Sequence, residues 1–92
     1  MQKRHDDILN SRIEQAVMYG VSKIEDWELR LWYGLHRIGK ATYRDLNDRF
    51  ERMAEADHQE GAILNCYRTH TGDVHLIHSD GLKKMAELAG DA

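Results

Sequence analysis

The chain lacks proline altogether and contains a single cysteine, Cys66. One cysteine cannot close an internal disulfide, and the absence of a CxxC pair excludes a cysteine-based zinc site. Without proline, helices have few built-in stops, so glycines and capping residues must set their ends. No apolar run is long enough to span a bilayer, and the opening MQKRHDDILNSR is too polar for a signal peptide. We therefore expect a cytoplasmic protein without a membrane partner.

An excess of positive charge is also missing. Thirteen Lys and Arg against sixteen Asp and Glu give a formal net charge of −3. This balance does not favour a nucleic-acid partner, although the local distribution of charge matters more than its sum. The hydrophobic fraction of 41% excludes a disordered chain of low hydrophobicity. The 92 residues indicate one domain over 1–92, with a core so modest that a second copy or another partner would help it.

The first segment predicts a helix over residues 1–20 that Gly20 ends. Its apolar residues recur at helical spacing and are Leu9, Ile13, Ala16 and Val17. A single apolar stripe on a terminal helix indicates an arm, which packs either on the body of the domain or on a twin chain in a homodimer.

A second helix is predicted to start at Ser22, because Ser22 and Glu25 have the spacing of a capping box. Trp32 and Tyr33 widen its apolar stripe, and Gly39 is expected to end it. The stripe itself is the strongest periodic signal of the chain and consists of Ile24, Trp27, Leu31, Leu35 and Ile38.

A third segment has Thr42 at a position typical of a helix cap. Lys40 and Ala41, just before it, could form a single strand pair between two helices. The apolar face of this helix is predicted to be Leu46, Phe50 and Met53. Residues 57–69 leave two interpretations open, a further helix or a strand from Ala62. Gly61 weakens the helix by about 1 kcal/mol relative to alanine.

The stretch THTGDVHLIHSDG, residues 69–81, predicts a turn at HTGD and a strand at VHLIH. Ser79 is expected to cap a last helix that buries Leu82, Met85, Leu88 and Ala89. His70, His75 and His78 could gather around an ion, but His75 and His78 point to opposite faces of a regular strand. A zinc site needs about four ligands, so no metal or cofactor is expected.

Two stretches carry a resemblance to a known family. EDWELRLWYGLHRIGKATYRDLNDRF resembles the first two helices of a winged helix-turn-helix domain, and GDVHLIHSDGLKKMAEL resembles its second wing strand and closing helix. The resemblance covers roughly Glu25 to Leu88. It implies an α+β, mostly α fold: a winged-helix-like three-helix core within residues 22–89, with a C-terminal β-hairpin and flanking N- and C-terminal helices.

The resemblance also implies a small DNA-binding transcriptional regulator that binds double-stranded DNA. Its recognition helix would lie near Ala54 to Arg68 and enter a major groove. Three carboxylates in that stretch would meet phosphates unfavourably and are Glu55, Asp57 and Glu60. The fold is therefore better supported than the DNA binding.

Candidate DNA contacts are basic residues near the link between the helices and polar residues of the expected recognition helix. They are Arg30, Arg37, Lys40, Arg44, Gln59, Asn65 and Arg68. Arg30 and Arg37 are seven residues apart and would share a helical face. Asp45 and Asp48 interleave with the basic residues at the spacing of intrahelical pairs, so a solvated, salt-bridged face competes with a phosphate-binding one.

The acidic run gives an alternative function, a non-enzymatic adaptor or inhibitor that binds a basic protein surface. Phage-encoded inhibitors of host machinery, such as anti-CRISPR proteins, are comparable in size and charge. Three aromatics within seven residues cannot all point inward, so one is a candidate anchor. The candidate contacts are Glu55, Asp57, Glu60 and Trp32. No nucleophile elbow or glycine-rich phosphate loop occurs, so we do not expect an enzyme.

Overall fold

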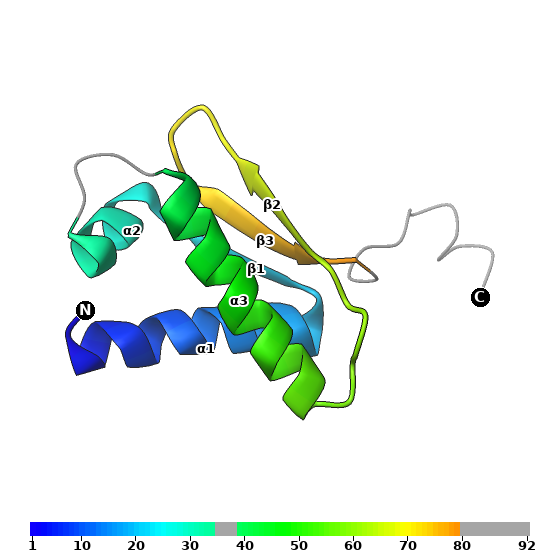
Figure 1. Ribbon diagram of the computed structural model, residues 1–92. Coiled ribbons are helices and arrows are strands. Elements are labelled where there is room, and N and C mark those ends of the chain that lie inside the picture. Colours follow the sequence, from blue (N-terminus) through cyan, green and yellow to red (C-terminus); the bar gives the residue numbers. More distant parts are fainter. Residues whose placement is uncertain (35–38, 80–92) are drawn as a thin grey trace.

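The computed structural model describes residues 1–34 and 39–79. The elements follow in the order α1 (Lys3–Tyr19), β1 (Val21–Ile24), α2 (Asp26–Tyr33), α3 (Lys40–Ala56), β2 (Leu64–Arg68) and β3 (Val74–His78). The strands form one antiparallel sheet in which β3 lies between β1 and β2. Figure 1 shows α1 and α3 crossing beside this sheet, with α2 next to the start of α3. The fold is α+β, as the sequence predicted.

The core lies where α1, α3 and one face of the sheet meet. Helix α1 buries the predicted stripe, and Gly20, with φ of 92°, ends it as predicted. Leu46 and Phe50 of α3 and Val74 and Leu76 of β3 are also fully buried. Contacts of α1 with α3, β1 and β3 make it one of the helices that build this core, so it packs on the body of its own chain.

The predicted start of the second helix at Ser22 is wrong. Ser22 is buried in β1, where it pairs with Leu76 of the central strand. The hydrogen bonds that this segment gains in the sheet outweigh its capping pattern. Helix α2 begins at Asp26 instead, with Glu25 as N-cap and a reciprocal capping box between Glu25 and Glu28.

Helix α2 also buries a different face from the predicted one. Leu29 and Trp32 are 0% and 4% exposed, whereas Trp27 and Leu31 are 60% and 52% exposed. The predicted stripe assumed one long helix, but its first residue belongs to β1 and α2 ends at Gly34, which has φ of 64°. The remainder of that stripe, Leu35 and Ile38, lies outside the described residues.

The start of α3 corrects two further predictions. The helix begins at Lys40 with Gly39 as N-cap, so Gly39 precedes α3 and does not end α2. Thr42 is a buried residue of the first turn and not a cap. Lys40 and Ala41 are helical and form no strand pair.

The open alternative for residues 57–69 resolves as a strand. Helix α3 ends at Ala56, and β2 follows after a turn in which Gly61 has φ of 87°. The prediction of a recognition helix over 54–68 is therefore wrong. Leu64 and Cys66 turn toward the core, because strand side chains alternate and these two lie on the covered face.

The predicted β-hairpin is confirmed. Strands β2 and β3 pair from Leu64↔His78 to Arg68↔Val74, and the HTGD turn joins them. His78 is buried and His75 is half-buried, at positions of β3 that alternate in facing, as predicted. The helix expected after Ser79, with Leu82, Met85, Leu88 and Ala89, lies outside the described residues.

Candidate nucleic-acid interface

The charge of the solvent-facing side chains of α3 changes sign along the helix. Lys40 and Arg44 are exposed and Asn47 is half-buried, and their spacing places all three on one face. No ion pair between described residues involves Lys40 or Arg44. Further along, the exposed charged residues are mainly acidic and are Asp48, Glu51 and Glu55, with Arg52 among them. The exposed charges are thus basic at the start of α3 and mainly acidic toward its end.

A groove of about 340 Å³ runs beside the basic half of α3. Its walls are Tyr43 and Asn47 from α3 and Leu64, Cys66 and Arg68 from β2. Burial raises the pKa of the Cys66 thiol, which keeps the thiol protonated and a poor nucleophile. The groove therefore offers polar and cationic contacts from two elements and no evident covalent chemistry.

Arg68 reaches from β2 to the first residue of α2. Its Nη2 lies 3.2 Å from Asp26 Oδ1, and its Nε donates to the Gly72 carbonyl at 3.4 Å. Arg30 Nε donates to the other oxygen, Asp26 Oδ2, at 2.8 Å. The hydrogen bond from Arg30, followed by that from Arg68, holds the pKa of Asp26 below its usual value against partial desolvation. Asp26 is therefore an anion shared between two arginines.

The hairpin turn rests on the same end of α2. The Asp26 amide donates to Asp73 Oδ1 at 3.0 Å, and Lys23 Nζ lies 3.7 Å from Asp73 Oδ2. Gly72 is buried with φ of 94°, and a Cβ there would come within 2.7 Å of Asp26 Oδ1. The turn is thus fixed by a close backbone approach, which only glycine permits, and by a cap on α2.

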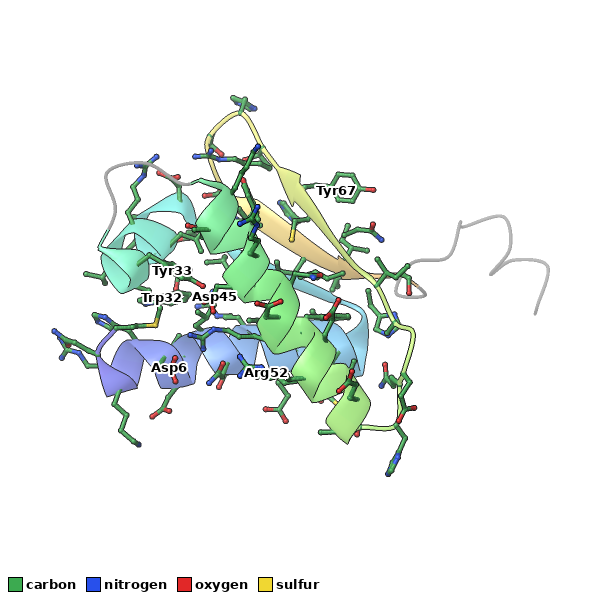
Figure 2. The ribbon with its side chains drawn as sticks, viewed as in Figure 1. Asp6, Trp32, Tyr33, Asp45, Arg52 and Tyr67 are labelled. Atoms are coloured by element: carbon green, nitrogen blue, oxygen red, sulfur yellow. The ribbon has the colours of Figure 1, made fainter. Side chains whose placement is uncertain are left out.

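A second charged network lies among the three helices. Arg49, with a side chain 14% exposed, contacts Asp6 Oδ1 at 2.7 Å, Asp45 Oδ2 at 2.9 Å and Asn10 Oδ1 at 2.7 Å. Tyr33 donates to Asp45 Oδ2 at 2.6 Å. Burial and the neighbouring Asp45 carboxylate raise the pKa of Tyr33. Figure 2 shows Tyr33 and Asp45 between α2 and α3, with Asp6 on α1 below them. Through these contacts Arg49 holds α1 and α3 together, so its role is structural.

The predicted DNA contacts are not brought together as one surface. Lys40 and Arg44 share α3, and Arg30 and Arg68 share Asp26. The remaining three are in other positions: Gln59 follows α3 and bonds to His78, Asn65 is exposed on β2, and Arg37 lies outside the described residues. The sequence interpretation missed Tyr43 and Asn47 as interface residues, because the groove they line forms only where α3 meets β2, and no local pattern indicates that contact.

The residues predicted to contact a protein partner are also not all on one surface. Glu55, Asp57 and Glu60 are exposed at the end of α3 and in the turn after it. Trp32 is buried, with Arg12 above its ring at 5.8 Å, so its assignment as an exposed anchor is wrong. The exposed aromatic of α2 is Trp27.

Across residues 1–34 and 39–79, no group of three or more His, Cys, Asp and Glu side chains is arranged to hold a metal ion. Among the described helices, none is both long and apolar enough to cross a bilayer. Comparisons with protein-family models, with curated proteins and with solved structures find no match for this chain.

Proposed function

We propose that the chain is a winged-helix DNA-binding regulator in which the N-terminal half of α3 enters the major groove. Helices α2 and α3, joined by a short link and followed by the β2–β3 hairpin, support the winged-helix part of this proposal. In helix-turn-helix proteins the second helix of the pair contacts base edges through its N-terminal residues. We therefore assign the recognition helix to α3 in place of residues 54–68.

The observation that carries the proposal is the separation of charge on α3. Lys40 and Arg44 supply cations for phosphates or guanine edges, and Asn47 is a side chain suited to adenine. Asp48 directly follows Asn47, whereas Glu51 and Glu55 lie seven and eleven residues beyond Arg44, about 10 Å and 16 Å along the helix axis. Glu51 and Glu55 can therefore stay outside a groove that the basic half enters.

Fluorescence anisotropy with a labelled 20-base-pair duplex of mixed sequence tests the proposal. Lys40→Ala and Arg44→Ala should each weaken binding and reduce the slope of log affinity against log salt by about one. Arg52→Ala is the matched control, because Arg52 is exposed on the acidic half of the same helix. Equal losses in Arg44→Ala and Arg52→Ala, or no binding by the natural chain at low salt, would contradict the proposal.

A second candidate function rests on the acidic half of α3. Glu51 and Glu55 continue through the turn to Asp57 and Glu60, and all four are exposed. We propose a basic protein surface as the alternative partner. In that case charge reversal at Glu55, Asp57 and Glu60 abolishes co-purification of the partner from the native host, while Arg44→Ala leaves it unchanged.

A further inference from the structure

Arg68 lies in two environments at once. Its side chain lines the groove beside Tyr43 and Asn47, next to the basic half of α3. Its guanidinium, however, is turned to Asp26 on a different element. A cation next to the proposed DNA-binding half of α3 is therefore neutralised within the chain.

We propose that the Asp26 carboxylate occupies, in the free protein, the position that a DNA phosphate takes on Arg68 in the complex. The α3–β2 groove then contains a phosphodiester-binding site that opens when Arg68 exchanges one anion for another. This inference rests on the proposed DNA-binding function and assigns one of its phosphate contacts. Asp26 thus competes with DNA and lowers its affinity.

The exposure of the pair makes such an exchange feasible. The side chains of Arg68 and Asp26 are 37% and 26% exposed, and ion pairs in contact with water are weak. Arg68 also makes a single contact with the carboxylate, without the two parallel bonds of the strongest arginine pairs. A phosphate held beside the groove by other contacts can replace such a partner.

Both Asp26 and the hairpin turn have other contacts that hold them in place without Arg68. When Arg68 leaves, Asp26 keeps Arg30 within its own helix, so the carboxylate stays paired. The turn keeps the bond from the Asp26 amide to Asp73 and the pair between Lys23 and Asp73. Arg68 can therefore change partner while the turn stays in place.

Asp26→Asn tests this proposal, because it removes the competing charge and keeps the shape of the side chain. We expect a three- to tenfold gain in duplex affinity at low salt, and a salt slope steeper by about one as Arg68 becomes available to a phosphate. Adding Arg68→Ala to Asp26→Asn should cancel both changes.

The matched control is Glu25→Gln, which removes one negative charge from the neighbouring position. No ion pair between described residues involves Glu25, and glutamine keeps an oxygen that can accept the capping hydrogen bond. Equal gains in Asp26→Asn and Glu25→Gln would reduce the effect to net charge and overturn the proposal. Weaker binding by Asp26→Asn would also overturn it, because Asp26 would then help to position the DNA-binding surface.

A readout without DNA separates this inference from the proposed function. The Nε–Hε signal of Arg68 can be followed by NMR while inorganic phosphate is added to the natural chain and to Asp26→Asn. A response at lower phosphate in Asp26→Asn supports the competition, even if neither protein binds the duplex and the proposed function fails. The same response in both proteins overturns the competition, whatever the duplex affinity.

Discussion

Two of the charged networks of this small protein are built in opposite ways. One surrounds a cation: Arg49 is largely buried and has acceptors on both α1 and α3. The other surrounds an anion: Asp26 is partly exposed and is shared by Arg30 of its own helix and Arg68 of β2. The first ties helices into the core, and the second joins the hairpin to α2.

This difference in exposure indicates which network can exchange its ion-pair partners and which cannot. Arg49 is the least exposed charge of either network, and a buried cation that loses its partners is left without water or compensation. A pair in contact with solvent can be replaced at little cost by water or another ion. Stability should therefore depend on the Arg49 network, and functional adjustment on the Asp26 network.

Arg49→Met should give the largest effect. The substitution keeps much of the apolar stem but leaves Asp6, Asp45 and Asn10 without their common donor. We expect the free energy of unfolding to fall by about 2.5 kcal/mol, below the range for breaking a fully buried pair, because the two carboxylates left behind are more than a third exposed. Urea denaturation followed by circular dichroism measures it.

Arg52→Met is the control for this prediction. Arg52 lies on the same helix, is exposed, and takes part in no ion pair among the residues that the structure describes. Its replacement should change the free energy of unfolding by less than about 0.5 kcal/mol. If both variants lost the same stability, the Arg49 network would have no special role.

Gly72→Ala tests how the second network is placed. The new Cβ would come within 2.7 Å of Asp26 Oδ1 at a backbone φ of 94°, so the turn must move away from α2. We expect a loss of about 2 kcal/mol from the strained backbone and the close contact together. The same denaturation experiment measures this loss.

Gly61→Ala separates the two causes. Gly61 has a similar φ of 87°, but a Cβ there meets nothing within 4 Å. Its substitution should cost only the backbone part, about 1 kcal/mol. Equal losses at the two glycines would mean that the contact between the turn and Asp26 contributes nothing to stability.

The elements that the sequence predicts well are those set by local pattern. The stripe from Leu9 to Val17 and the Gly20 stop are confirmed, and so is the VHLIH strand after its turn. In each of these the side-chain period and the glycine that ends the segment agree with the tertiary structure. The α+β class follows from them.

The wrong predictions arise where a distant partner decides the local structure. Ser22 has the pattern of a helix cap, but it lies in a strand because it pairs with β3. Its partner in the sheet is Leu76, fifty-four residues further along the chain. That shift moves the start of α2 and exchanges Trp27 for Trp32 in the core. Pairing with β3 also makes Leu64–Arg68 a strand, which rules out a recognition helix over 54–68.

The Arg49 and Asp26 networks each contain one pair at the local spacing of four residues, Asp45–Arg49 and Asp26–Arg30. The contacts that join different elements, Arg68 to Asp26 and Arg49 to Asp6, connect residues so far apart in sequence that no local spacing indicates them.

Tyr33→Phe should give the smallest effect of the three, and one that depends on pH. The substitution removes the hydrogen bond from the Tyr33 hydroxyl to Asp45 Oδ2, which is worth about 1 kcal/mol near neutral pH. Burial and Asp45 raise the pKa of Tyr33 in the folded chain above its ordinary value of 10.0. Between these two pKa values the folded chain holds a proton that the unfolded chain has lost. The free energy of unfolding must therefore decline as pH rises beyond about 10.

Denaturation midpoints measured from pH 8 to pH 11 in the natural chain and in Tyr33→Phe would show this decline. The difference in stability between the two proteins should shrink, and then change sign, as the pH rises through the unfolded pKa. The Asp26 network titrates at the opposite end of the pH scale, because the pKa of its carboxyl is lowered. A constant difference across this range would mean that burial and the Asp45 carboxylate do not hold the proton on the Tyr33 hydroxyl, and that this edge of the Arg49 network is open to water.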